Sequence, residues 1–313
     1  MEYLSLLIGL AGLWFGTEIT IRGGVTVAER LGVSEFIVGV AILSIGSDLP
    51  ELAIAVDGAL KNLGELDTAD VIVGTALGSS LAQIGFVLGV AALLSYLTLP
   101  QGIIYRHGSV LLGSVVLLGV FGFDGYVTRT EGFALVTVYL IYFAALFGDR
   151  SKRTNRAGDD GAPGNLSAWS NLLIGLAIVI LCAELTVDGA IAVAAALDIS
   201  EAFIAVIIIG LGTSLPELSI SVGAAIRKRA RMSVGNLIGS NIFDTLMPVG
   251  VAAAIAGLRF NSNLLRFEVP FLFILSLVVL FFFVRKRGIQ KGEAVTILAL
   301  YCGYVLLKFS KVF

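Results

Sequence analysis

The chain has 313 residues, of which 57% are hydrophobic and only 14% are charged, and its net charge is −2. A soluble domain carries about 25% charged residues, so this composition excludes an ordinary soluble protein and indicates an integral membrane protein. The two cysteines and the single histidine lack metal-ligand spacing, which argues against a disulfide framework or a zinc site. The first apolar run begins at once without a basic segment before it, so we expect no cleavable signal peptide.

Ten apolar runs are long enough to cross a bilayer as helices, because a span needs about 20 such residues. They lie at roughly 3–21, 35–60, 70–97, 103–121, 131–148, 169–192, 201–226, 232–256, 268–284 and 293–309. The polar segment 149–167 separates five runs from five. We therefore expect an all-α membrane protein in which residues 1–148 and 168–313 form two five-helix repeats joined by a linker at 149–167.

Lysine and arginine concentrate in alternate loops. Fifteen of the 21 fall in one set of loops, which includes the basic stretches 150–156, 227–231 and 285–291. Such an excess marks the cytoplasmic side of a membrane protein. We therefore expect a multi-pass protein of the cell membrane with a cytoplasmic linker and both termini outside. We interpret the stretch 285–291 as a membrane anchor and expect no nucleic-acid partner.

The two halves of the sequence match each other. A shift of 166 residues places 33–56 over 199–222 without a gap, and 11 of the 23 positions from Ser34 to Val56 are then identical. A shift of 161 aligns GTALGSSLAQ (74–83) with GNLIGSNIFD (235–244). Because each half has an odd number of spans, the second copy enters the membrane upside down. This inverted repeat is typical of secondary transporters, whose sites lie near the midplane on interrupted helices.

The first repeated motif is predicted to break a helix within the membrane. Pro50 and Pro216 lack an N–H and clash with the preceding turn, which frees carbonyl oxygens around 43–47 and 209–213. Such carbonyls are tolerated only where they are buried in protein or line a cavity. Glu51 and Glu217 add a carboxylate directly after each proline. A kinked helix with an acid that merely packs is the alternative, but two matched intramembrane acids favour a shared cation as their partner.

The second repeated motif carries glycines and polar side chains on one helix face. We expect its four glycines to allow close helix packing: Gly74, Gly78, Gly235 and Gly239. Ser79 and Gln83 are four residues apart, as are Ser240 and Asp244, so each pair shares a face. All these candidate ligands are oxygens, which suits Ca²⁺, Na⁺, Mg²⁺ or Mn²⁺ rather than zinc or copper.

The paired motifs GSDLPE/GTSLPE and GTALGSSLAQ/GNLIGSNIFD resemble those of the calcium/cation antiporter superfamily, closest to archaeal and bacterial sodium/calcium exchangers. The resemblance covers the whole chain. It implies two inverted five-helix repeats and sliding of the first and sixth spans against the other eight. It also implies ion ligation or lining by Glu51, Glu217, Ser47, Thr213, Ser214, Ser79, Ser240, Asp244 and Gln83, and by the carbonyls of Ser44 and Gly210. In such a site Asp244 and Gln83 would face each other across the centre.

Two positions depart from the pattern that the resemblance implies. Members of this branch usually carry serine or threonine at the position of Asp48, and asparagine or aspartate at that of Gln83. Because Asp48 adds an acid where Gln83 lacks one, each half still offers two carboxylates: Asp48 and Glu51 in the first, Glu217 and Asp244 in the second. We expect Asp48 to join the site, with an orientation toward the aqueous access path as the alternative.

The function that we expect is Na⁺/Ca²⁺ exchange that exports Ca²⁺ by alternating access, carried out by a monomer. The transported ions occupy the site, and no other cofactor is expected. The first rival is a proton-coupled exchanger of Ca²⁺ or Mn²⁺ in which Asp48 titrates. A channel, a cation sensor and an enzyme are weaker rivals, since a duplicated cage suits none of them. Glu18 and Arg22, four residues apart, are expected to form an interfacial ion pair, with a gating role as the alternative.

Overall fold

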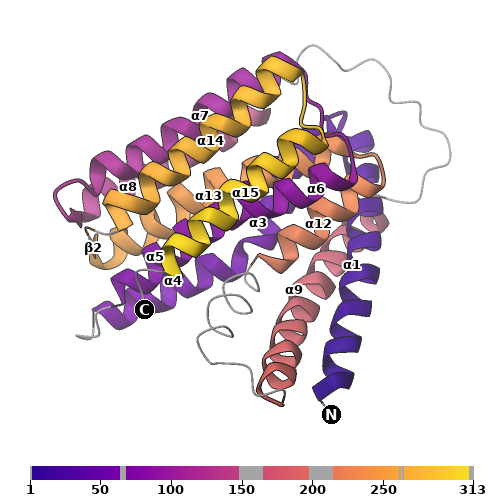
Figure 1. The fold of residues 1–313 in the computed structure, drawn as a ribbon, viewed down its shortest axis with the longest axis horizontal. Helices are drawn as coiled ribbons and strands as arrows, with labels where there is room; N and C mark the ends of the chain where they lie inside the picture. Colours follow the sequence, from indigo (N-terminus) through magenta and orange to yellow (C-terminus); the bar gives the residue numbers. More distant parts are fainter. Residues whose placement is uncertain are drawn as a thin grey trace.

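The structure is a computed structural model that describes residues 2–63, 68–147, 165–196, 214–260, 262 and 264–309. Nearly all of these residues are helical, as Figure 1 shows. In chain order the elements are α1 (Glu2–Leu31), α2 (Glu35–Val38), the π-helix η1 (Gly39–Leu43), α3 (Ser44–Ser47), α4 (Leu49–Asn62), α5 (Ala69–Ala82), the π-helix η2 (Gln83–Val87), α6 (Leu88–Leu94), α7 (Gln101–Phe121), β1 (Tyr126–Val127), α8 (Arg129–Phe147), α9 (Asn165–Ala196), α12 (Leu215–Ile226), α13 (Ala230–Ala256), β2 (Leu258–Arg259), the π-helix η5 (Leu264–Glu268), α14 (Val269–Lys286) and α15 (Lys291–Phe309).

Helix α13 lies at the centre of the fold. It packs against α4, α5, α7, α8 and α12 and against η1, and most of its side chains are buried. A helix that is covered all round can keep polar residues only where they find partners or serve a function. Helix α13 carries Asn236, Ser240, Asn241 and Asp244 within its buried stretch. The fold therefore places a polar strip at its own centre.

The close packing expected at the four motif glycines is present at the two of the second repeat. A Cβ atom on Gly235 would lie 2.6 Å from the Phe36 carbonyl oxygen, and one on Gly239 would lie 2.7 Å from that of Val40. On Gly74 or Gly78 it would meet no described atom within 4 Å. The 166-residue shift pairs Phe36 and Val40 with 202 and 206, which lie outside the described part of the chain, so close packing at these two glycines stays a prediction.

Gly235 and Gly113 give a pair of contrasting variants, because Gly113 is an exposed glycine of α7 on which a Cβ atom would meet no described atom within 4 Å. Gly235→Ala is expected to destabilise the protein by about 1–3 kcal/mol, since the added methyl group meets backbone that cannot yield easily. Gly113→Ala is expected to be neutral or to stabilise by at most about 1 kcal/mol. Thermal unfolding in detergent measures both, and equal losses would contradict the packing described.

The predicted break in the second span is present. Helices α3 and α4 meet at Asp48, and the helical segments 35–47 and 49–62 are bent by 45° relative to each other. Asp48 itself has left the helix (φ −90°, ψ 3°), while Pro50 occupies the first turn of α4, where a missing N–H is tolerated. Ser214, its equivalent in the second repeat, has nearly the same conformation (φ −94°, ψ 9°) before α12. Both halves therefore begin a new helix directly before the Pro-Glu pair.

Helices α1 and α9 form an antiparallel pair at one side of the molecule (Figure 1). Glycines let the two backbones approach closely: a Cβ atom on Gly23 would lie 2.5 Å from the Leu172 nitrogen, and one on Gly175 would lie 2.5 Å from the Thr20 nitrogen. Buried apolar residues of this pair, such as Leu13 and Val179, belong to a cluster that is separate from the main core. The pair is thus tightly joined within itself and packs on the rest of the protein through its own apolar cluster.

Six helices among the described residues are long and apolar enough to cross a membrane, and the bent pair 35–47 and 49–62 makes a seventh. The structure thus does not reach the ten spans expected from the sequence. The shortfall includes α12, which has only 12 described residues because 197–213 lie outside the described part of the chain. A multi-pass helical membrane protein is nevertheless the architecture that these helices form.

Short contacts tie the loops together at the two ends of the helices. Strands β1 and β2 pair antiparallel, with Tyr126 opposite Arg259. Elsewhere, Leu97 bridges to Ile289.

A cavity of about 800 Å³ is lined by basic-loop residues such as Arg229 and Arg231, and none of the predicted ion ligands lines it.

Candidate functional site

Four helical segments that are distant in sequence bring the predicted ligands to one buried region. The α3–α4 break carries Ser44, Ser47, Asp48 and Glu51, and α12 with the residue before it carries Ser214 and Glu217. The second motif adds residues from α5, η2 and α13: Ser79, Gln83, Ser240 and Asp244. None of these ten side chains is more than 3% exposed. Thr213 and Gly210, also predicted as ligands, lie outside the described residues.

Gln83 connects the two repeats at the centre of the site. Its amide nitrogen donates to Asp244 Oδ2 at 3.0 Å and to Ser79 Oγ at 3.2 Å. Ser79 Oγ lies in turn 3.4 Å from Ser214 Oγ. The expectation that Gln83 and Asp244 face each other is met by this contact. The Gln83 amide thus donates a hydrogen bond to Asp244, whereas a carboxylate at position 83 would repel it.

The site concentrates buried carboxylates. Both oxygens of Asp48, Glu51 and Glu217, and Oδ1 of Asp244, are buried and accept no hydrogen bond from the described residues. Asp48 interacts electrostatically with each of the other three acids. None of the ion pairs between described residues includes any of the four. Burying unpaired charge costs several kcal/mol per ion, so this arrangement calls for cations or protons as partners.

The four carboxylates do not form an ion cage by themselves. Among the described residues, no group of three Asp, Glu, His or Cys side chains is arranged closely enough to hold a metal ion. Coordination of a cation here therefore depends also on hydroxyl, amide and main-chain oxygens. Such mixed oxygen sets are what Ca²⁺ and other hard cations bind.

The carbonyl and hydroxyl oxygens near the break differ in availability. The Ser44 carbonyl accepts hydrogen bonds from the Asp48 nitrogen at 2.9 Å and from Ser47 Oγ at 3.2 Å. To ligate an ion, it would have to exchange the Ser47 hydroxyl for that ion. Ser240 Oγ is buried and makes no hydrogen bond to the described residues, so it is free to ligate.

The structure places Asp48 beside the other three predicted acidic ligands. Asp48 is fully buried, its nitrogen donates to Ser44, and its carbonyl accepts from the Leu52 nitrogen at 3.2 Å. These main-chain bonds hold the residue at the junction of α3 and α4. Asp48 is thereby the equivalent in the first repeat of Ser214 in the second, with nearly the same backbone conformation.

Sequence reasoning missed Asn241. Its amide nitrogen donates to Gln83 Oε1 at 2.8 Å and to the Leu237 carbonyl at 2.9 Å, which orients the Gln83 amide so that its nitrogen points at Asp244. The sequence does hold a signal for it: under the 161-residue shift Asn241 aligns with Ser80, so that GSN (239–241) lies over GSS (78–80). Asn241 is therefore a supporting residue for the Gln83–Asp244 contact.

The helix irregularities at Gln83 and Asp244 were also missed. A π-helix begins at Gln83, and its carbonyl accepts from the Leu88 nitrogen five residues on. In α13 the equivalent stretch ends at Pro248, which has no N–H for the carbonyl of Asp244 four residues earlier. π-Bulges are frequent at functional sites. Both repeats thus alter the helix after the same position by different means.

The chain was compared with known families and proteins. The sequence model of the family described as "Sodium/calcium exchanger protein" matches residues 1–148 and 167–310. An uncharacterised membrane protein of Methanocaldococcus jannaschii is 32% identical over 94% of each chain. The sodium/calcium exchanger MaX1 of Methanosarcina acetivorans is 27% identical over 99% of each chain.

Solved structures of the sodium–calcium exchanger NCX_Mj have the same fold. One, from a crystal soaked with Na⁺ and Ca²⁺, superposes with a TM-score of 0.83 at 31% identity and covers 97% of each chain. Another, soaked without either ion, gives 0.83 at 30% identity over 100% of this chain. With the family match spanning both halves, the chain belongs to the sodium/calcium exchanger family.

Proposed function

We propose that this protein exchanges Na⁺ for Ca²⁺ across the cell membrane by alternating access, and that it exports Ca²⁺. The observation that carries the proposal is the group of four buried acids, Asp48, Glu51, Glu217 and Asp244, in a chain that resembles named sodium/calcium exchangers over nearly its whole length. The ions are its cargo, and the transport step uses no catalytic residue and no resident cofactor.

The charge of the site supports exchange over simple release. A bound Ca²⁺ neutralises two carboxylates, and Na⁺ ions at separate subsites can do the same after Ca²⁺ leaves. An empty ionised site would have to carry its charge through a closed, dry intermediate, which is costly. The return of the transporter is therefore fast only when a second cation is bound, which couples the two ion fluxes.

We place the ligands in the following roles. Glu51 and Glu217 provide the central charges, because each follows the helix break of its own repeat. Asp48 and Asp244 supply the remaining carboxylates. The other oxygens come from Ser47, Thr213, Ser214, Ser79, Ser240 and Gln83, and from the carbonyls of Ser44 and Gly210.

The architecture we propose has ten spans in two inverted repeats, 1–148 and 168–313, around a linker at 149–167. Each of the ten apolar runs contains a helix in the described structure. The family match divides at the same place, between 148 and 167. The matching conformations of Asp48 and Ser214 also support a duplicated unit.

The orientation we propose places the basic loops and the linker in the cytoplasm and both termini outside. Residues of separate basic loops meet in the structure: Arg229 and Arg231 line one cavity with Glu29 and Tyr96. Tyr96 also lies beside Lys286 and Arg287, with its hydroxyl 3.3 Å from each of their carbonyl oxygens. One end of the molecule thus gathers loops from both halves, as the rule for positive charge requires.

Proton-coupled exchange is the second candidate, and the named relatives do not favour it. The test is ⁴⁵Ca²⁺ uptake by proteoliposomes. With Na⁺ inside and none outside, at equal and buffered pH on both sides, we expect uptake that collapses when a Na⁺ ionophore is added. Uptake that needs a pH gradient and ignores Na⁺ would contradict the proposal. A protein that moves Ca²⁺ without any counter-ion would be a channel.

A further inference from the structure

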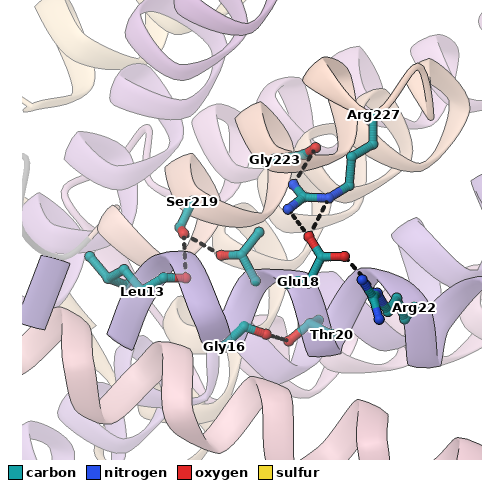
Figure 2. Close-up of polar contacts among 9 residues, drawn as sticks. Leu13, Gly16, Glu18, Thr20, Arg22, Ser219, Gly223 and Arg227 are labelled. Carbon is teal, nitrogen blue, oxygen red and sulfur yellow. Dashed lines mark hydrogen bonds and ion pairs between the residues drawn. The ribbon is translucent and has the colours of Figure 1, made fainter. Parts of the chain in front are cut away.

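A polar contact joins α1 to α12 outside the candidate ion site (Figure 2). Glu18 lies between two arginines: Oε1 accepts from Arg22 Nε at 2.6 Å, and Oε2 accepts from Arg227 Nε at 2.9 Å and also from Arg227 Nη2. Arg227 Nη1 donates to the Gly223 carbonyl at 3.0 Å. The expected Glu18–Arg22 pair is present, and Arg227 adds a second partner that the sequence did not indicate.

The same face of α12 makes a second contact with α1, about two helical turns before Arg227. The hydroxyls of Thr17 and Ser219 are hydrogen-bonded to each other, and Ser219 Oγ lies 3.4 Å from the Leu13 carbonyl. Ser219, Gly223 and Arg227 are spaced by four, so they form one stripe along α12. A side chain on Gly223 would collide with Thr17. The stripe therefore packs closely against α1 in the register that the structure shows.

The other face of α12 belongs to the ion site. Glu217 is fully buried there, and Ser221 Oγ accepts from Asn236 of α13 at 3.0 Å. Helix α12 thus contacts the candidate ligands on one side and α1 on the other. Helix α1 in turn is joined to α9 through their glycines and packs in an apolar cluster separate from the main core.

We propose that Glu18 and Arg227 are positioning residues, whose ion pair holds α1 in one register against α12 and has to break during each exchange cycle. The inference rests on the proposed function, since it concerns the motion that moves the ions. Arg22 allows the Glu18–Arg227 ion pair to open and close repeatedly. When Arg227 separates, Glu18 keeps a partner four residues along its own helix, so no unpaired carboxylate remains.

The exposure of the pair suits this role. The Glu18 and Arg227 side chains are 28% and 21% exposed, whereas Arg22 is 76% exposed and follows Glu18 wherever α1 goes. Partly exposed ion pairs are weak enough to open on the time scale of transport. The Arg227 guanidinium also lies over the Trp14 ring, 5.4 Å from its centroid, and this cation–π contact stabilises the same register of α1 against α12. It would be lost when Arg227 separates from Glu18.

The test is a reversible cross-link across this interface. Thr17→Cys and Ser219→Cys are introduced together after both native cysteines, Cys182 and Cys302, are replaced by alanine. We expect an oxidant to form the disulfide, Na⁺-driven Ca²⁺ uptake to stop in proportion to the cross-linked fraction, and a reducing agent to restore it. The two single-cysteine variants are the controls.

Two results of this experiment would overturn the inference. Cross-linked protein that exchanges as fast as reduced protein would show that the register does not change, and cysteines that fail to cross-link would show that the contact does not exist. If the double-cysteine protein forms the cross-link on oxidation but neither it in the reduced state nor the natural protein shows Na⁺-driven uptake, the proposed function fails and the register inference falls with it. The gel shift of the cross-link is independent of transport and separates these cases.

The role of the ion pair itself is read from the rate of cross-linking. Adding Glu18→Gln or Arg227→Gln to the cysteine pair is expected to slow disulfide formation by up to about fivefold, because the register is less occupied. The double variant is expected to equal the single ones, since both remove one interaction. Lys61→Gln removes a different ion pair, with Asp57, and is expected to change nothing. Unchanged rates in both single variants would contradict the assignment.

Discussion

Replacing Glu51 or Glu217 by glutamine is expected to abolish Na⁺-coupled Ca²⁺ uptake. Each glutamine keeps the shape of the side chain and one carbonyl oxygen, but removes a charge from a fully enclosed site. Loss of one member of a buried charged contact costs about 2–5 kcal/mol, so Ca²⁺ affinity is expected to fall by at least about 30-fold. ⁴⁵Ca²⁺ binding to purified protein and uptake by proteoliposomes measure the two effects separately.

A matched control for these variants is Glu268→Gln. Glu268 is another buried acid, but it pairs with Lys308 at 2.7 Å and lies at the start of α14, outside the candidate site. We expect this variant to lose some stability and to keep coupled uptake. Robust transport by Glu51→Gln or Glu217→Gln would remove the role that we assign to the central acids. A loss with Glu268→Gln equal to theirs would mean that any buried acid has the same effect.

Replacing Asp48 by serine is expected to produce the second-largest effect. The change gives the first repeat the residue that the second repeat has at Ser214, and it leaves three buried carboxylates. With less negative charge in the site, the apparent affinity for Na⁺ or Ca²⁺ is expected to fall by about tenfold or more. Protons compete with cations for these carboxylates, so exchange by the variant is expected to depend less on pH than exchange by the natural protein.

The measurement is the rate of Na⁺-driven uptake over a range of Na⁺ concentrations and pH values. Asp57→Ser is the control, because Asp57 lies on α4, which begins directly after Asp48, but is exposed and pairs with Lys61. If Asp48→Ser has the same Na⁺ and pH profiles as the natural protein, Asp48 does not take part in ion binding despite its burial.

The sequence predicted the parts of the site that local chemistry determines. A proline inside a membrane span interrupts the helix, and Pro50 does so between α3 and α4. The paired motifs place Glu51 and Glu217 at equivalent points of the two repeats. The contact between Gln83 and Asp244 was expected from the resemblance and is present. The first two predictions follow from residue type and from the pairing of the two halves, whereas the third depends on the resemblance.

The remainder depends on packing that no local pattern describes. Gly235 touches the backbone of Phe36 because α13 lies at the centre of the fold. Asn241 supports Gln83 only because α13 passes beside η2. Arg227 reaches Glu18 across 209 residues of sequence. In each case the partner comes from the other half of the chain, and sequence spacing carries no record of it.

The most direct test of the central claim is to locate a divalent cation in the protein. Crystals soaked with Sr²⁺, a heavier stand-in for Ca²⁺, are examined by anomalous diffraction. We expect a peak bounded by the carboxylates of Glu51 and Glu217, and we expect it to disappear when Na⁺ is raised in the soak. A strong peak elsewhere with none between these two residues would contradict the account, as would a central peak that Na⁺ does not displace.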